Sequence, residues 1–185
     1  MDDELTTTFQ IDDDIRLRTF ADGDAEVVFQ TALRNRDHLI EFMHWMTPDY
    51  SISSAEEFIA RSIKAVAAKS SLGFGIFRGQ HFIGSIGFVQ FDWAARKTEI
   101  GYWIDKLEEG KGIVTRSCER LIRYAFEDLN LNRIEIRCST ENVRSAAIPE
   151  RLGFRKEGLL RQVELRNGRL HDFNVYGLLA DDRRV

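Results

Sequence analysis

EIGYWIDKLEEGKGIVT, from Glu99 to Thr115, is an apolar run followed by a short acidic loop, the turn Gly110-Lys111-Gly112 and the start of a helical pattern. This order predicts a strand, a glycine turn and a helix. A helix leaves its first backbone N–H groups without intrahelical acceptors, at the positive end of its dipole. A glycine turn that leads into a helix can therefore hold an anion, and phosphate is the anion we expect here.

Two common phosphate-binding motifs do not fit this chain. The Walker motif requires a glycine five residues before its Gly-Lys pair and a Ser or Thr after it, but Asp105 and Gly112 occupy these positions. The dinucleotide-binding fingerprint opens a helix, whereas Gly73, Gly75 and Gly79 fall in and beside a strand-like run. Neither motif explains the glycine turn.

The composition is that of an ordinary globular chain. Its 185 residues are 43% hydrophobic and 30% charged, which suits one domain with a sizeable core. We expect residues 1–14 to form a solvated acidic tail and residues 15–185 to form a single domain. The net charge of -4 and the lack of a basic run argue against a nucleic-acid surface.

Other features favour a cytoplasmic location. No segment approaches the ~20 apolar residues of a membrane span. The start MDDELTTT is acidic, unlike the basic leader of a signal peptide. Cys118 and Cys138 fall in a helical and a strand pattern, where each is expected to be a small buried hydrophobe rather than half of a disulfide.

The pattern along the chain predicts an α/β domain with a mixed sheet. Before the glycine turn we first expect a strand over 15–20, followed by a helix that is capped by Asp24 and ends at Asn35. An apolar helix over 36–46 and a helix begun by the capping box Ser54-Ala55-Glu56-Glu57 follow. Three strands are then expected over 72–77, 81–91 and 98–104. After the turn, one apolar face from Cys118 to Leu129 predicts a crossover helix, and residues 134–138 predict a strand parallel to the Ile100 strand. A short helix over 142–152 and a hairpin at Asn167-Gly168 complete the chain.

Glu109 to Thr115 resembles the acetyl-CoA pyrophosphate loop of the GNAT acetyltransferases, whose pattern is Gln/Arg-x-x-Gly-x-Gly/Ala. The flanking segments IGYWI, LNRIEIRCSTENVRS and ERLGFRKEG stand in the order found in the RimJ/RimL-like branch, the ribosomal-protein N-acetyltransferases. The resemblance covers roughly residues 15–179. Glu109, where the family usually has Gln or Arg, and Val114, where it often has Gly or Ala, depart from the pattern.

The resemblance implies the GNAT fold, a mixed, mostly antiparallel sheet of about seven strands with helices on both faces. Two parallel strands would splay apart, here Ile100 to Ile104 and Arg133 to Cys138, and the pantetheine arm of the cosubstrate acetyl-CoA would insert between them. The implied cofactor-binding residues are Tyr102, Trp103 and Ile104, acting chiefly through their backbone, together with Gly110, Lys111, Gly112, Ile113, Val114, Thr115, Asn142 and Ser145. We expect the Glu109 side chain to turn to solvent, away from the phosphates.

Asn142 and Ser145 form an N-x-x-S pattern at the start of a helix. By residue type alone, Asn142 is a good N-cap and Ser145 an ordinary first-turn serine. The resemblance implies that Asn142 hydrogen-bonds the cofactor arm and that Ser145 is the acid that assists thiolate departure. Pro149 has no N–H, so the carbonyl of Ser145 must find a partner in water or the cofactor, unless the helix simply kinks there.

Direct acyl transfer requires a neutral amine and a donor for the developing oxyanion. Glu99 is the first candidate for the base, directly or through water, with Glu41 and Asp172 as alternatives; by residue type alone, Glu99 could be a solvated strand-end carboxylate. A strand N–H around Trp103 or Ile104 would serve the oxyanion. The resemblance implies that Phe42, His44, Trp45 and Trp93 face the acceptor, although aromatic residues at this spacing could equally be core.

The function that this resemblance implies is acetyl-CoA-dependent transfer of an acetyl group to a primary amine, with the N-terminal α-amine of a ribosomal protein as the expected acceptor. A small-amine acetyltransferase, acting on a polyamine, an aminoglycoside or an amino acid, and a non-catalytic acyl-CoA-binding module are the alternatives. The four histidines show no metal-binding spacing, and neither cysteine has the neighbours of an activated thiol. We therefore expect no metal, nucleic-acid or membrane partner, while a homo-oligomer is compatible with the sequence.

Overall fold

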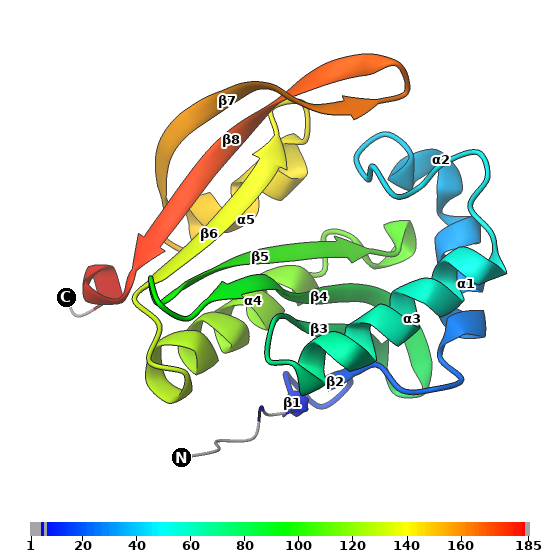
Figure 1. Ribbon diagram of the computed structural model, residues 1–185, viewed down its shortest axis with the longest axis horizontal. Coiled ribbons are helices and arrows are strands. Elements are labelled where there is room, and N and C mark those ends of the chain that lie inside the picture. The colour runs from blue at the N-terminus through cyan, green and yellow to red at the C-terminus, as the bar shows by residue number, and fades with distance from the viewer. Residues whose placement is uncertain (1–4, 6, 184–185) are drawn as a thin grey trace.

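The computed structural model describes residue 5 and residues 7–183. The described residues form one eight-stranded mixed sheet (Figure 1) with the order β1-β2-β3-β4-β5-β6-β8-β7. The strands are β1 (Thr8–Gln10), β2 (Ile15–Thr19), β3 (Leu72–Arg78), β4 (His81–Asp92), β5 (Lys97–Ile104), β6 (Arg133–Ser139), β7 (Arg155–Arg166) and β8 (Arg169–Leu179). The predicted mixed sheet is confirmed.

Helices cover both faces of the sheet, as predicted. Helices α1 (Ala25–Arg34) and α3 (Ile52–Ala67) pack on one face, next to the four-residue helix α2 (Arg36–Leu39). Helix α4 (Ile113–Arg123), which continues as a π-helical turn, packs on the other face, and α5 (Val143–Arg151) packs on β6 and β7. Short 3-10 turns span Lys106–Glu108 and Ala180–Arg183. Cys118 and Cys138 are buried free thiols, as expected.

Strands β5 and β6 form the parallel pair, and their pairing is short. It spans only Lys97 to Glu99 on β5, and its last pair joins Glu99 to Glu135. Beyond this point Tyr102 and its neighbours pair with β4 alone, while β6 continues with β8 alone. Figure 1 shows β5 and β6 diverging beyond their paired residues. The divergence leaves one backbone edge of each strand free to bind something inserted between them.

Several predictions about the N-terminal third were wrong. Thr8–Gln10 is an edge strand rather than part of a solvated tail, because Phe9 is buried against the core; it gives the sheet eight strands instead of about seven. Residues 1–4 and 6 of that predicted tail lie outside the described residues. The expected helix over 36–46 ends at Leu39, and the apolar residues beyond it pack as a loop around Met46.

Helix α3 begins earlier than predicted. Ser51 is its N-cap, and Ser54 Oγ accepts a hydrogen bond from the Ser51 N–H at 3.3 Å, so Ser54 is the third residue of the helix and not its cap. Asp24 does precede α1, but its carboxylate binds Arg18 at 2.7 Å instead of capping the helix. An ion pair with the neighbouring strand has replaced the local cap in this case.

Asp105 fixes the start of the glycine loop. Its N–H donates to the Ile83 carbonyl at 2.8 Å, and its carboxylate accepts from the Leu107 N–H at 3.0 Å and from Arg34 Nη2 at 2.6 Å. Burial alone would raise the pKa of Asp105, but these hydrogen bonds outweigh it and hold the pKa below its ordinary value of 3.8. The loop is thereby tied to both β4 and α1.

We predict that Asp105→Asn lowers the free energy of unfolding by about 2 kcal/mol at neutral pH, because a charge-assisted hydrogen bond is lost. The carboxylate stabilises the fold above its unfolded-state pKa, and this contribution disappears as the pH falls through the lowered folded-state pKa. Urea unfolding from pH 7 to pH 2 should therefore show that the free energies of unfolding of the wild type and Asp105→Asn become similar in acid. The control is Glu57→Gln, which removes an exposed ion pair within one helix and should change the free energy of unfolding little. A change in Asp105→Asn as small as that of the control would contradict the prediction.

Gly84 in β4 lets the free arm of β5 approach closely. Its φ is +157°, and a Cβ there would lie 2.4 Å from the Trp103 carbonyl oxygen. We predict that Gly84→Ala costs roughly 1–3 kcal/mol in unfolding free energy, since backbone atoms must move to admit the methyl group. Gly158→Ala, whose Cβ would meet no atom within 4 Å, should change it by less than about 0.5 kcal/mol. Similar costs for the two variants would contradict this account.

Candidate active site

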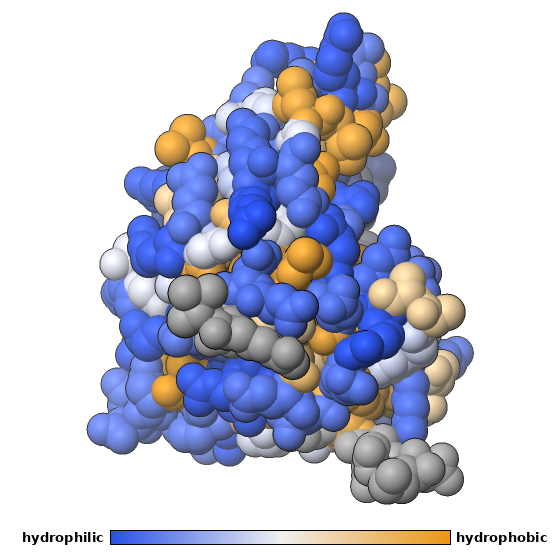
Figure 2. Space-filling view, turned by 90° about the vertical axis from the view of Figure 1, so that its left-hand side faces the viewer, coloured by the Kyte–Doolittle hydropathy of each residue, from blue (hydrophilic) through white to orange (hydrophobic). Residues whose placement is uncertain are grey.

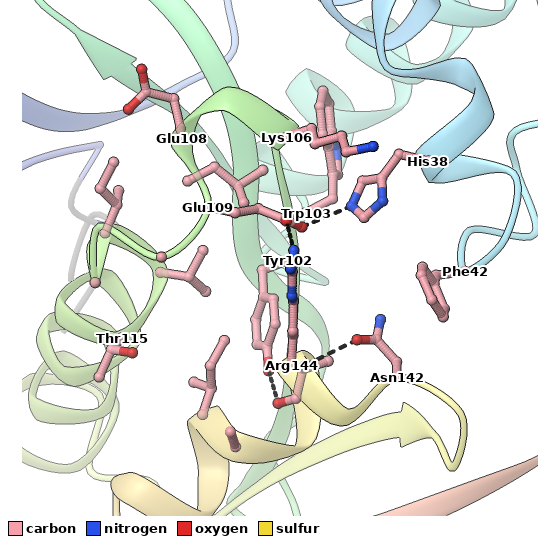
Figure 3. A pocket seen from close by; sticks show the side chains of 18 of the residues that line it. His38, Phe42, Tyr102, Trp103, Lys106, Glu108, Glu109, Thr115, Asn142 and Arg144 are labelled. Atoms are coloured by element: carbon pink, nitrogen blue, oxygen red, sulfur yellow. Dashed lines mark hydrogen bonds and ion pairs between the residues drawn. The ribbon is translucent and has the colours of Figure 1, made fainter.

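A cavity of about 830 Å³ brings together most of the predicted site residues. Its wall includes the free arm of β5, the glycine loop and the first turns of α4 and α5 (Figure 3). The predicted residues found there are Phe42, Tyr102, Trp103, Ile104, Gly110, Gly112, Ile113, Val114, Thr115, Asn142 and Ser145. Lys111 is not part of this wall, although its Nζ pairs at 3.1 Å with Glu108, which is.

At one end of the cavity the glycine loop leads into α4. Gly110 and Gly112 have φ values of +75° and +71°, which side-chain-bearing residues rarely adopt. Gly112 is the N-cap of α4, and the first intrahelical bond runs from the Arg116 N–H to the Gly112 carbonyl. The N–H groups before Arg116 therefore point out of the helix at its positive end.

Two arginines add positive charge at this end. Arg116 lines the cavity and donates to the Lys111 carbonyl at 3.0 Å, and its other terminal nitrogen pairs with Asp12 at 2.8 Å. Arg151 at the end of α5 also lines the cavity and donates to Thr115 Oγ1 at 3.1 Å. The backbone donors and both guanidinium groups suit a phosphate group.

The Glu109 side chain does not turn to solvent, and that prediction was wrong. Its carboxylate binds His38 Nε2 at 2.8 Å and Arg144 from α5, and its side chain is only 17% exposed. Figure 3 shows His38 and Arg144 approaching Glu109 from different sides of the cavity. The attraction of two cationic or polar partners across the cavity outweighs hydration of the carboxylate.

Asn142 combines both of the roles considered for it. Its Oδ1 accepts the Ser145 N–H at 3.0 Å, so it caps α5. Its amide nitrogen points into the cavity (Figure 3). The cap fixes the side chain in this orientation, and the same residue can present a donor to a ligand in the cavity.

Ser145 is held by Tyr102. Ser145 Oγ donates to the Tyr102 hydroxyl at 3.2 Å, and the Tyr102 hydroxyl donates to the Ser145 carbonyl at 3.1 Å. Pro149 lies inside α5, as predicted, and the carbonyl that it leaves without a helical donor is this one. Tyr102 was expected to act through its backbone, but its side chain reaches from β5 to α5.

Glu99 and His44 lie on a second cavity of about 520 Å³, away from Ser145. Glu99 pairs with Arg137 at 3.4 Å and its side chain is 30% exposed. Burial raises the pKa of Glu99 above its ordinary value, although Arg137 opposes this. His44 Nδ1 lies 3.4 Å from Glu164. The walls include Leu160, Val163, Leu165 and Phe173 from the β7–β8 hairpin.

The remaining predicted residues do not line either cavity. Trp45 packs beside Trp103, with ring centroids 5.8 Å apart, and so supports the β5 arm from the core. Trp93 stacks on Phe91 and donates to the Lys69 carbonyl, and its expected place on the acceptor side stays a prediction. Of the alternative bases, Glu41 is exposed and Asp172 accepts the Gln162 N–H.

Several charged or polar cavity residues were missed in the sequence, among them His38, Arg116, Arg144 and Arg151. Arg144 lies inside the N-x-x-S pattern, and Arg116 lies in the first helical turn after the glycine loop. Their positions in these motifs could have indicated that both arginines lie near the site. His38 lies in α2, and its side chain lines the cavity, where it pairs with Glu109. No sequence pattern indicated that arrangement.

No group of three or more His, Cys, Asp or Glu side chains in the described part of the chain could hold a metal ion. None of the described helices has the length and apolar character needed to cross a membrane.

Comparison with known proteins agrees with this geometry. Residues 14–155 match the model of the acetyltransferase (GNAT) domain. The chain is 35% identical over 173 residues to the "Putative ribosomal N-acetyltransferase YdaF" of Bacillus subtilis (strain 168), covering 93% of this chain and 94% of that protein. It is 26% identical over 179 residues to the ribosomal-protein-serine acetyltransferase of Escherichia coli (strain K12), covering 97% of this chain and 100% of the relative.

A solved structure extends the agreement to three dimensions. The microcin C7 self-immunity acetyltransferase MccE, solved in complex with acetyl-CoA and AMP, superposes with a TM-score of 0.88 at 29% identity, covering 95% of this chain and 98% of that one. The family match spans most of the chain and includes the glycine loop and the N-x-x-S pattern. This chain belongs to the GNAT family of N-acetyltransferases.

Proposed function

We propose that this protein transfers the acetyl group of acetyl-CoA directly to the N-terminal α-amine of a protein, with ribosomal proteins in the cytoplasm as the expected acceptors. One observation carries the proposal: a single cavity connects the anion-binding N-terminus of α4, the free arm of β5 and Ser145. An acyl-CoA has a phosphate end, an extended amide arm and a thioester in the same linear order. The names of the ribosomal-protein acetyltransferase relatives support the acceptor class.

The residues present suit each part of the cosubstrate. The N–H groups of Ile113 to Thr115, with Arg116 and Arg151, would hold the pyrophosphate. Backbone groups of Trp103 and Ile104, which β6 leaves unpaired, would hydrogen-bond the pantetheine amides. Bound acetyl-CoA supplies the thioester carbonyl that the amine attacks.

Proton transfers in this scheme are assigned to Ser145 and Glu99. Ser145 would protonate the departing sulfur, and a Trp103 or Ile104 N–H would stabilise the oxyanion. Glu99 would take the amine proton, and its position on the second cavity favours a route through water. An α-amine of pKa about 7.7–8.0 costs roughly 1.4 kcal/mol to neutralise at pH 7, against roughly 4.6 kcal/mol for a lysine, so an α-amine needs only a weak base.

Release of CoA from acetyl-CoA, measured with N-terminal peptides of ribosomal proteins and with polyamines, aminoglycosides and amino acids, tests the proposal. We expect peptide-dependent turnover and acetylation of the peptide α-amine by mass spectrometry. Turnover confined to small amines would show that the acceptor is a small amine and not the N-terminus of a protein. Tight CoA binding without turnover on any acceptor would indicate a binding module and refute the enzymatic role.

We predict that the pH profile of kcat/KM has, at lower pH than the limb set by the α-amine, a second acid limb that reports Glu99. Glu99 accepts a proton only when ionised, and burial raises its pKa, so the rate should fall as the pH drops through a value above the ordinary 4.5. Glu99→Gln should lower kcat/KM about a hundredfold or more and remove this limb. Glu119→Gln on the exposed side of α4 is the control. An unchanged rate and profile in Glu99→Gln would exclude Glu99 as the base.

A further inference from the structure

Tyr102 and Ser145 make a closed pair of hydrogen bonds between two elements that are far apart in sequence. The Ser145 hydroxyl donates to the Tyr102 hydroxyl at 3.2 Å, and the Tyr102 hydroxyl donates to the Ser145 carbonyl at 3.1 Å. Both residues line the main cavity. Tyr102 lies on the free arm of β5 and Ser145 in the first turn of α5, so the pair links this arm to the helix.

Pro149 explains why the carbonyl is available to Tyr102. In a regular helix the N–H of residue 149 would donate to the carbonyl of residue 145, but proline has no N–H. A carbonyl left without a donor away from water costs free energy comparable to a lost hydrogen bond. The Tyr102 hydroxyl supplies the missing donor, and this contact orients the ring toward Ser145.

The Tyr102 hydroxyl has one proton and two acceptors within reach. It donates to the Ser145 carbonyl while Ser145 Oγ donates to it. If the Ser145 proton turns toward a cavity ligand, the Tyr102 proton can turn to Ser145 Oγ at the same 3.2 Å separation. Burial raises the pKa of Tyr102 well above its ordinary value, so the phenol stays a donor throughout.

We propose that Tyr102 is the positioning residue for Ser145, whose hydroxyl it orients and whose oxygen it stabilises while Ser145 donates its proton to the departing sulfur. This inference rests on the proposed acetyl transfer. In that step the amine nitrogen forms the C–N bond, the C–S bond breaks, and the sulfur takes the Ser145 proton as the amine loses one to the base. Ser145 then recovers a proton from solvent, and Tyr102 keeps its own.

Steady-state kinetics of Tyr102→Phe with acetyl-CoA and a turned-over acceptor test the role. We expect kcat to fall about tenfold to a hundredfold, because a hydrogen bond to a group that is gaining charge is lost. The KM for acetyl-CoA should change less than about threefold. In a Ser145→Ala background the same substitution should have almost no further effect on kcat. Tyr176→Phe is the matched control, because that hydroxyl also holds α5, through Glu150 at 3.1 Å, but does not contact Ser145.

A merely structural Tyr102 gives a different result. Equal losses for Tyr102→Phe and Tyr176→Phe, or additive effects of Tyr102→Phe and Ser145→Ala, would overturn the positioning role, as would full kcat in Tyr102→Phe. These outcomes differ from failure of the proposed function, in which the wild-type protein itself would release no CoA with any acceptor. That failure would refute the Tyr102 role as well.

Pro149→Ala provides a measurement that does not depend on turnover. Alanine restores the helical N–H donor to the Ser145 carbonyl, so this carbonyl has a donor besides the Tyr102 hydroxyl. We expect the drop in melting temperature caused by Tyr102→Phe to be at least halved in the Pro149→Ala background. An unchanged drop would show that the Tyr102 hydroxyl is not held by this carbonyl, and would contradict the geometric basis of the inference.

Discussion

The site depends on the early end of the parallel pairing between β5 and β6. Three residues of β5 pair with β6, and after Glu99 the strands bond only to their outer neighbours. Unpaired backbone groups within a sheet are costly unless water or another chain satisfies them. In this protein such groups face the gap between β5 and β6, where an extended, amide-bearing ligand would complete the ladder. The remaining elements hold this gap open.

Each neighbouring element contributes one constraint to the gap. Gly84 allows the free arm of β5 to lie close against β4. Asp105 ties the loop that follows this arm to β4 and α1, so the anion-binding turn starts from a fixed point. On the other side, Asn142 caps α5. The same gap is crossed by Glu109, which pairs with His38 and Arg144 where a phosphate-bearing ligand would approach. A ligand must therefore fit beside these ion pairs or exchange partners with them.

Much of the fold was predictable because its signals are local. Alternating strands, the Asn167-Gly168 hairpin and the apolar face of α4 follow from periodicity and turn chemistry. The errors occurred where tertiary contacts override local preference. Phe9 draws a polar segment into the sheet, and the loop after Leu39 packs its apolar residues without a helix. In the site, the glycine loop and the N-x-x-S pattern were visible as motifs. The Tyr102 hydroxyl, His38 and the Glu109 ion pairs were not, since each joins segments 35 or more residues apart.

We infer that the gap between β5 and β6 receives the arm of an acyl-CoA. A crystal structure of the protein with CoA tests this inference most directly. We expect pantetheine amides hydrogen-bonded to the Trp103–Ile104 backbone, phosphates on the N–H groups of Ile113 to Thr115, and the sulfur within hydrogen-bonding distance of Ser145 Oγ. CoA bound elsewhere, or β5 and β6 closed into a continuous ladder with the sulfur remote from Ser145, would contradict it.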